Sequence, residues 1–229
     1  MDADTLVVIP ARGGSKGIPH KNINIFNGKP LITYAIDCAR AITLDNNICV
    51  STDDDEIIEV VENYGLKVPF KRPDYLATDQ CSTYDVLLHA LDFYESINRK
   101  YKKLILLQPT SPFRTKGDVE KASALYSNDI DMVVSVTDAS GNYYKEDQEG
   151  LLKNILGETA YTRRQDMSKM WRYNGAVYVI NVLSLRQMPL SKFQRIRKYE
   201  MDEIHSIDLD TMFDWKLAEF VINEKLIYI

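Results

Sequence analysis

Cysteine and histidine are scarce in this chain, which has 229 residues and only three of each. The cysteines, an odd number, stand far apart at Cys38, Cys49 and Cys81, and the histidines show no ligand spacing. These absences argue against a disulfide framework and against a metal site built on thiolate or imidazole. Because unpaired cysteines suit a reducing compartment, we expect a cytoplasmic protein in which Cys38 and Cys49 are small buried hydrophobic residues.

Long apolar runs and an excess of positive charge are also missing. No hydrophobic stretch approaches the roughly 18 residues of a membrane span. The acidic start, Met1-Asp-Ala-Asp, leads into a predicted strand and does not resemble a secretory signal. The net charge of −5 argues against nucleic acid as a partner, although a local basic pocket is still allowed. We therefore expect neither a membrane nor a nucleic acid among the partners.

What the sequence does contain is a regular alternation of strand and helix signals. Short apolar runs predict strands, and apolar residues spaced by three or four predict helices between them. The predicted strands are 5–9, 47–51, 67–70, 103–107, 132–137 and 176–181, and the predicted helices are 30–42, 54–64, 83–98, 117–126 and 211–224. This order predicts a single α/β domain over residues 1–229, built on a mostly parallel, doubly wound, Rossmann-like sheet.

The alternation breaks in the polar segment 138–166, which is too long for a plain loop in a compact domain. It is expected to be either a projecting excursion with its own structure or a lid. Its apolar side chains would have little core beneath them, and such exposed patches usually mark interfaces. They are Tyr143, Tyr144, Leu151, Leu152, Ile155 and Leu156. The segment therefore predicts a homodimer, with active sites that borrow residues from the partner subunit.

The most informative stretch is the loop at 10–22, which follows the apolar run Leu6–Ile9. It combines three glycines, at 13, 14 and 17, with the three cations Arg12, Lys16 and Lys21. Glycines let backbone N–H groups approach an anion closely, and ligands bind at the carboxyl edge of open α/β sheets. The glycine spacing matches neither a P-loop nor the dinucleotide fingerprint. A basic surface turn is the alternative, but three cations among three glycines favour a phosphate site.

A pair of carboxylates, Asp208 and Asp210, lies just before the last predicted helix. If the segment is extended, both side chains point to the same side. Two hard oxygen ligands suit Mg²⁺, which commonly binds one or two carboxylates together with substrate phosphates. An aspartate that caps the helix beginning near Thr211 is an equally good interpretation of the spacing alone.

Two further charged clusters have ordinary alternatives. The acidic run 53–56 opens a predicted helix, where acids favour the helix dipole, and is interpreted mainly as a cap. Arg163, Arg164 and Arg172 lie near Asn174-Gly175 and suggest anion recognition, because guanidinium groups bind phosphate or carboxylate bidentately. A solvated charge run is the alternative. Ser82 is expected to cap the helix predicted at 83–98.

Five motifs together resemble the CMP-sialic acid synthetase (acylneuraminate cytidylyltransferase) family. The loop matches that family's I-P-A-R-x-G-S-K-G-x-x-x-K-N signature in full, from Ile9 to Asn22. The segments 72–79, 107–114 and 206–210 are similar to its R-P-x-x-L-A-x-D, L-Q-P-T-S-P-[LF]-R and S-I-D-h-D elements, where h is apolar. Arg164 and Arg172 keep the eight-residue interval of its paired arginine motif. The resemblance covers the chain from Leu6 to the last helix.

The resemblance implies an enzyme that joins CTP and a nine-carbon acidic sugar into a CMP-sugar and pyrophosphate. It implies Arg12, Lys21 and Asp210 as catalytic residues, and Asp208 with Asp210 as ligands of a Mg²⁺ cofactor. It also implies that the segment 138–166 pairs with a second subunit. The implied substrate-binding residues are Ala11, Ser15, Lys16, Asn22, Arg72, Ser82, Gln108, Arg164, Asn174 and Tyr178.

The sequence departs from the family pattern at two places. Tyr173 stands where relatives often have proline. Asn142 is followed directly by Tyr143 where relatives often read Asn-Pro-Tyr, and this second departure leaves the sugar open among sialic, legionaminic and pseudaminic acids. Two other functions remain as alternatives: a related enzyme that uses GTP, and a non-catalytic nucleotide-binding relative. The intact cations and both aspartates argue against the second.

Overall fold

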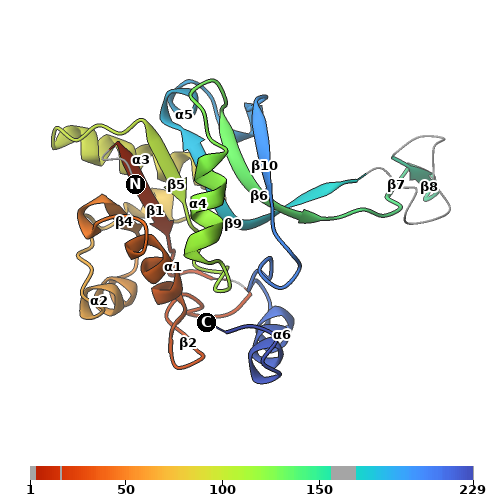
Figure 1. The fold of residues 1–229 in the computed structure, drawn as a ribbon, viewed down its shortest axis with the longest axis horizontal. Coiled ribbons are helices and arrows are strands. Elements are labelled where there is room, and N and C mark those ends of the chain that lie inside the picture. Colours follow the sequence, from red (N-terminus) through yellow and green to blue (C-terminus); the bar gives the residue numbers. More distant parts are fainter. Residues whose placement is uncertain (1–3, 16, 156–168, 229) are drawn as a thin grey trace.

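The computed structural model describes residues 4–15, 17–155 and 169–228 (Figure 1). In that part of the chain the main sheet has six strands. Their order is β4 (Ile48–Ser51), β1 (Thr5–Pro10), β5 (Lys103–Leu106), β9 (Trp171–Asn181), β6 (Met132–Asp138) and β10 (Ile196–Glu200). The β1–β4, β1–β5 and β6–β10 pairs are parallel, and β9 runs antiparallel to both of its neighbours. The predicted mostly parallel α/β sheet is confirmed.

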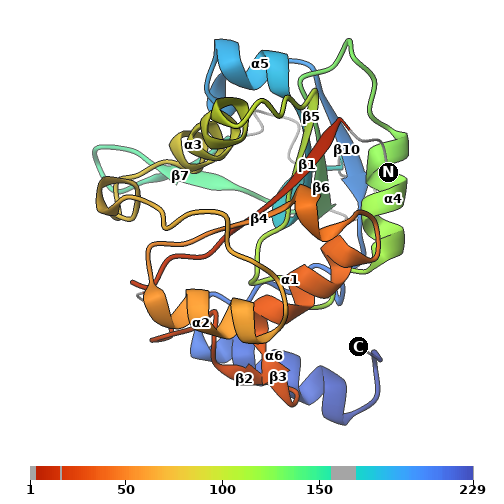
Figure 2. The same ribbon diagram turned by 90° about the vertical axis from the view of Figure 1, so that its left-hand side faces the viewer.

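Helices cover both faces of this sheet because its central strands are apolar on both sides. Along β1, Val7 and Ile9 face α1 (Leu31–Arg40), α2 (Asp55–Asn63) and α4 (Lys116–Ala124). Leu6 and Val8 face the opposite side, where α3 (Thr83–Ser96) and α5 (Val182–Gln187) pack (Figure 2). The result is a three-layer body with two apolar cores, one on each face of the sheet.

A third apolar cluster joins the C-terminal helix to the start of the chain. The helix α6 (Met212–Asn223) packs through Trp215 against the hairpin of β2 (Ile25–Phe26) and β3 (Lys29–Pro30). The Trp215 and Phe26 rings meet edge to face at 5.2 Å. This packing brings the segment that leads into α6 beside the loop that follows β1. Short 3₁₀ helices span Asp45–Asn47, Asp74–Leu76 and Leu190–Lys192.

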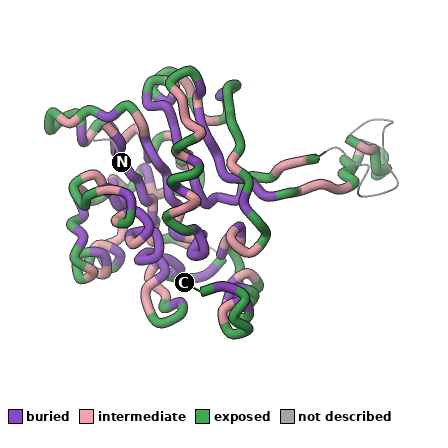
Figure 3. The backbone as a smooth tube through the Cα atoms, viewed as in Figure 1, coloured by how far each residue is buried: buried purple, intermediate pink, exposed green. Residues whose placement is uncertain are grey.

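A narrow arm extends from the body where β6 and β9 continue past the rest of the sheet (Figure 1). It carries the hairpin of β7 (Tyr144–Glu146) and β8 (Leu152–Asn154), which makes no ladder with the main sheet. The apolar side chains of this hairpin are largely exposed, and Figure 3 colours most of its residues as exposed. The exposed fraction is 51% for Tyr144, 67% for Leu152 and 57% for Ile155. Leu156 lies outside the described residues.

Most predicted elements are present, and the differences lie at the sheet edges. Residues 67–70 form no strand, and Lys71 makes only an isolated bridge to Thr52. Pro69 within that stretch lacks the N–H that a ladder requires. The elements α5 and β10 were not predicted. Cys38 and Cys49 are buried, as expected. No helix in the described part of the chain combines the length and apolar character needed to cross a membrane.

Candidate active-site cleft

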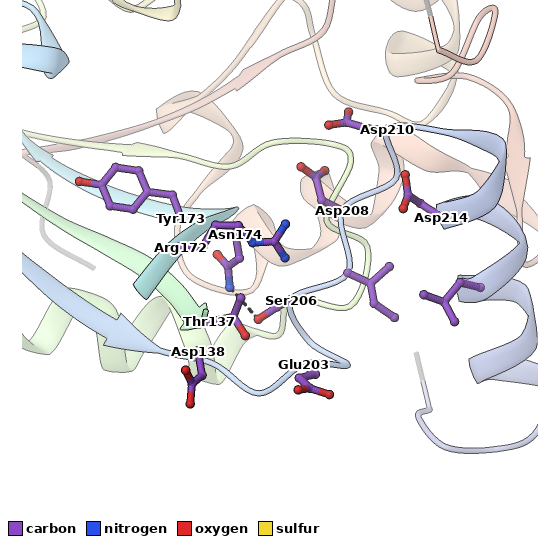
Figure 4. Close-up of a pocket in the computed structure, with 12 residues that line it drawn as sticks. Thr137, Asp138, Arg172, Tyr173, Asn174, Glu203, Ser206, Asp208, Asp210 and Asp214 are labelled. Atoms are coloured by element: carbon purple, nitrogen blue, oxygen red, sulfur yellow. Dashed lines mark hydrogen bonds between the residues drawn. The ribbon is translucent and has the colours of Figure 1, made fainter. Parts of the chain in front are cut away.

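Two adjoining cavities lie at the carboxyl edge of the sheet, where α/β proteins bind ligands. The first is at the ends of β1 and β5, and the second is at the end of β6. One has a volume of about 470 Å³ and contains the loop that follows β1, and the other has about 420 Å³ and reaches α6. Both are lined by Tyr173, Asp208 and Asp210, so they form one continuous cleft with two halves. Figure 4 shows the half that borders α6.

The loop after β1 supplies one wall of the first half. Arg12, Ser15, Lys21 and Asn22 line it. The amide of Asn22 donates to the carbonyl of Arg12 at 3.1 Å, which holds the loop in a tight curve. Lys21 is largely buried, and its Nζ lies 2.9 Å from Asp210 Oδ1. The structure therefore brings four of the predicted loop residues together; Lys16 lies outside the described residues.

Two loop glycines are needed for close approach rather than for backbone freedom. A Cβ on Gly13 would stand 2.1 Å from Asp54 Oδ2, and one on Gly17 would stand 2.1 Å from the carbonyl oxygen of Asp210. Contacts that short do not occur, so any side chain at either position would push the loop away from its neighbours. The loop is thus packed against the start of α2 on one side and the 208–210 segment on the other.

Side chains along the 208–210 segment point alternately into the core and into the cleft. Leu209 is fully buried in the α6 core, while Asp208 and Asp210 line the cleft on the other side (Figure 4). The Leu209 N–H donates to the carbonyl of Thr110 at 2.8 Å and ties this segment to the loop after β5. The cap of α6 is Thr211, which forms a capping box with Asp214. The interpretation of Asp208 or Asp210 as a helix cap is therefore wrong.

Asp208 is the most perturbed acid of the cleft. Burial raises its pKa to about 6, and the nearby charge of Asp210 adds to the rise. Its Oδ1 is buried and accepts no hydrogen bond within the described part of the chain. A buried carboxylate oxygen without a donor is costly unless a cation satisfies it. No cluster of three candidate metal ligands exists among the described residues, so a metal here would need substrate or water oxygens to complete its shell.

Gln108 lies in the loop after β5 and Tyr178 on the neighbouring strand β9, and both line the same half of the cleft. The buried Arg114 fixes the loop that carries Gln108, because its guanidinium donates to the Gln108 carbonyl at 3.0 Å and to the Ala176 carbonyl at 2.8 Å. Burial, together with the charge of Asp208, raises the pKa of Tyr178 to about 12. Tyr178 therefore offers a neutral hydroxyl to the cleft at physiological pH.

An irregularity in β9 places Tyr173, Asn174 and Gly175 at the cleft. Tyr178 pairs with Val134 but Tyr173 pairs with Val136, so β9 bulges between them. Bulges re-aim side chains and are common next to active sites. Within the bulge, buried Asn174 accepts from Ser135 Oγ at 2.5 Å and donates to Ser206 Oγ at 2.9 Å. Asn174 thus links β6 and β9 to the segment that carries Asp208.

Gly175, also in the bulge, offers a test of this geometry. It has φ of +78°, and a Cβ there would lie 2.6 Å from Gln108 Oε1. Gly175→Ala should therefore displace Gln108 and lower activity roughly tenfold, with about 1 kcal/mol lost from stability through the left-handed backbone. Gly28→Ala is the matched control, because Gly28 has φ of +88° and open space around it. Thermal melts and steady-state kinetics of both variants would separate the two effects; equal activities would contradict the prediction.

Some predicted substrate-binding residues lie away from the two cavities. Arg72 is only 3% exposed and pairs with Asp53 at 2.8 Å beside the end of β4. Ser82 caps α3 as expected, accepting from the Asp85 N–H, and does not line the cleft. Ala11 is buried and its N–H donates to the carbonyl of Ser51. Arg164 lies outside the described residues.

Other lining residues were not predicted from the sequence. Thr110 and Gly175 line the first half, and Asp138, Glu203 and Asp214 line the second. Thr110 and Gly175 sit inside motifs that were already recognised, so the motifs could have yielded them. The acids of the second half come from three separate segments, and nothing in their local sequence marks them.

The fold and the cleft define a class: a doubly wound α/β protein with a cationic, glycine-rich loop opposite a carboxylate pair. Comparison with known proteins narrows this class. The family model for cytidylyltransferase matches residues 6–226, and the chain belongs to that family.

Individual relatives agree with this. The chain is 33% identical over 216 residues to an N-acylneuraminate cytidylyltransferase of Streptococcus agalactiae, covering 92% of this chain and 51% of that protein. It thus spans about half the length of that relative. It is 30% identical to the CMP-N,N'-diacetyllegionaminic acid synthase of Legionella pneumophila, covering 93% and 94%. The structure of a CMP:2-keto-3-deoxy-manno-octonic acid synthetase complexed with CTP shares the fold, with a TM-score of 0.68, 19% identity and coverage of 96% and 99%.

Proposed function

We propose that this protein transfers CMP from CTP to the anomeric hydroxyl of a nonulosonic, sialic-type acid and releases pyrophosphate. The supporting observation is the cleft, where Arg12 and Lys21 of the loop at 10–22 (the phosphate loop) meet Asp208 and Asp210 across one cavity. Family membership and the relatives that act on such sugars support the same reaction. In this reaction the hydroxyl oxygen bonds to the α-phosphorus, the bond from the α-phosphorus to the oxygen that bridges to the β-phosphate breaks, and pyrophosphate and the hydroxyl proton are released.

The position of each residue in the cleft indicates its role in the reaction. Arg12 and Lys21 bind the triphosphate and neutralise the charge that builds up on the departing pyrophosphate. Ser15 and Asn22 lie on the same loop and add hydrogen bonds. Gln108 and Tyr178 line the same half of the cleft as the loop, and Asn174 lines the half that borders α6, so these three residues orient the acceptor sugar beside the triphosphate. Positioning of the two substrates in one cleft is itself a large part of the catalysis.

Asp208 and Asp210 fit a divalent cation. One oxygen of Asp208 is buried without a donor, and both carboxylates face the cleft beside the phosphate loop. Such a donor set, completed by phosphate oxygens, suits Mg²⁺. Bound there, Mg²⁺ would supply positive charge that withdraws electron density from the triphosphate. The Lys21–Asp210 contact would then set the position of one ligand and of the phosphate loop together.

The decisive experiment is an assay of pyrophosphate release with Mg²⁺, using each of the four nucleoside triphosphates and a panel of nonulosonic acids. We expect release only with CTP, and only when a nine-carbon acid is present. Release with GTP instead would replace the nucleotide assignment. Nucleotide binding without release for any acceptor would favour a non-catalytic relative.

We also propose that the protein forms a homodimer through the arm that carries β7 and β8. The arm exposes Tyr144, Leu152 and Ile155 with no core beneath them, and exposed apolar clusters of this kind usually mark interfaces. A two-fold pair of arms would cover these residues symmetrically. The arm rises from the strands that line the cleft, so it can reach the cleft of the partner.

Substitution of the arm should separate assembly from folding. Leu152→Asp combined with Ile155→Asp should convert the dimer into monomers with little activity. The matched control is Leu44→Asp with Leu183→Asp, two leucines that are equally exposed on the body, at 73% and 66%. Sedimentation velocity and activity at one protein concentration would test this. A fully active arm variant that sediments as a monomer would rule out the shared site and leave the proposed reaction standing.

A further inference from the structure

Several basic side chains of the phosphate loop contact carboxylates from different parts of the chain. Lys21 meets Asp210 at 2.9 Å, and His20 Nδ1 lies 3.3 Å from Glu56. Arg12 meets Asp79, with 2.9 Å between the guanidinium nitrogen and Oδ1. The Lys21 contact joins two residues already placed in the active site. The Arg12 contact is different, because Asp79 lines neither half of the cleft.

Asp79 belongs to a segment that is fixed at both ends. At its start, the Arg72 N–H donates to the carbonyl of Thr52 at 2.7 Å, and the buried Arg72 guanidinium pairs with Asp53. At its end, Ser82 caps α3. Between these anchors the Asp79 side chain is 50% exposed and extends to Arg12. The segment therefore presents a carboxylate to the phosphate-binding cation from a defined position.

The exposure of the two ion pairs sets which one can break. The Arg72–Asp53 pair is almost fully buried, and separating it would strand a buried charge. The Arg12–Asp79 pair is partly open to water, and exposed pairs of this kind are weak and screened by salt. A ligand that carries several negative charges can therefore take Arg12 from Asp79 without disturbing the anchor at Arg72.

We propose that Asp79 is an internal counter-ion that competes with phosphate groups for Arg12. This deepens the proposed function, because it rests on phosphates occupying the loop. Any phosphate ligand that binds Arg12 must first displace this carboxylate, so Asp79 weakens the binding of CTP and of pyrophosphate alike. By returning to Arg12 after transfer, Asp79 helps to expel pyrophosphate.

Whether Asp79→Asn tightens or weakens pyrophosphate binding tests this proposal. Asp79→Asn removes the competing charge and keeps the shape, so pyrophosphate and CTP should bind two- to fivefold more tightly, which corresponds to about 0.4–1 kcal/mol. Pyrophosphate should also become a stronger product inhibitor. Asp74→Asn is the matched control, because Asp74 makes the same charge change on the same segment and is not paired with Arg12. Titration calorimetry with inorganic pyrophosphate, without acceptor, gives both affinities.

A second set of variants separates competition from a general change of charge. In an Arg12→Ala background, Asp79→Asn should tighten pyrophosphate binding much less than it does in the wild type, because the Arg12–Asp79 pair is already gone. If Asp79 instead positions Arg12 for catalysis, Asp79→Asn weakens binding, and that result overturns the inference. An effect equal to that of Asp74→Asn overturns it as well. Wild-type protein that binds neither pyrophosphate nor CTP would reject the proposed function along with it, whereas normal turnover with an unchanged Asp79→Asn affinity rejects this inference alone.

Discussion

Replacing Asp208 by asparagine should reduce CMP transfer by roughly 10²-fold or more while leaving the fold intact. The side chain faces the cleft, and one of its oxygens lies buried without a hydrogen-bond donor. The amide has nearly the same shape but lacks the charge that a cation and a triphosphate require. Steady-state kinetics with saturating CTP and Mg²⁺ would measure the loss. Activity near that of the wild type would remove Asp208 from the proposed mechanism.

The same substitution should make the metal-free protein more stable at alkaline pH. Burial raises the Asp208 pKa from the usual 3.8 to about 6, so the folded state holds a proton that the unfolded chain releases between those values. The wild type therefore loses stability as pH rises from 4 to 6, whereas the asparagine variant does not. At pH 8 in a chelator, Asp208→Asn should be more stable by about 1–3 kcal/mol. At pH 4 the difference should vanish, and thermal melts at both pH values would check this.

Loss of Lys21 should be the next most damaging change. Lys21 is largely buried in the phosphate loop and contacts Asp210, so Lys21→Ala removes a phosphate ligand and leaves a carboxylate unpaired. A hydrogen bond to a charged group contributes about 1.5–3 kcal/mol, which predicts a tenfold to hundredfold fall in kcat/KM for CTP. Arg12→Ala should fall in the same range.

Lys71→Ala is the control for this prediction. Lys71 also pairs with an aspartate, Asp55, but on the surface outside the cleft. Its loss should leave kcat/KM unchanged and hardly alter stability, because exposed ion pairs contribute little. Comparable kinetics for Lys21→Ala and Lys71→Ala would mean that the loop cations serve the fold and not the phosphates.

The parts of the fold that could be predicted are those where local pattern and burial agree. β1, β5 and β6 are apolar runs bounded by turns, and α1 shows helical spacing, so each was located within a few residues. β10 was missed because Ile196–Glu200 is an edge strand whose side chains are mostly exposed and charged, as edges tend to be. The start of β9 was missed because residues 171–173 pair along the arm, where no core imposes an apolar pattern.

The residues of the candidate site also differ in whether local sequence patterns reveal them. The loop residues and the Asp208–Asp210 pair could be found because each set is contiguous and lies at the end of a predicted element. The burial of Arg72 could not be predicted, since it depends on Asp53, which contacts Arg72 only in the folded chain. The pairing of Arg12 with Asp79 depends on a tertiary approach of the same kind. Such ion pairs carry no periodic signal, so local sequence patterns do not reveal them.

β9 has a mechanical consequence. It spans Trp171–Asn181, and at about 3.3 Å per residue it is a ribbon roughly 36 Å long. One end pairs with β6 along the arm, the middle holds Tyr173 and Gly175 in the cleft, and the other end lies in the core of the sheet. β9 therefore connects the arm to the core through the bulge that lines the cleft. In the proposed dimer, separation of the arms would remove their support from the bulge in the cleft, so specific activity should fall on dilution.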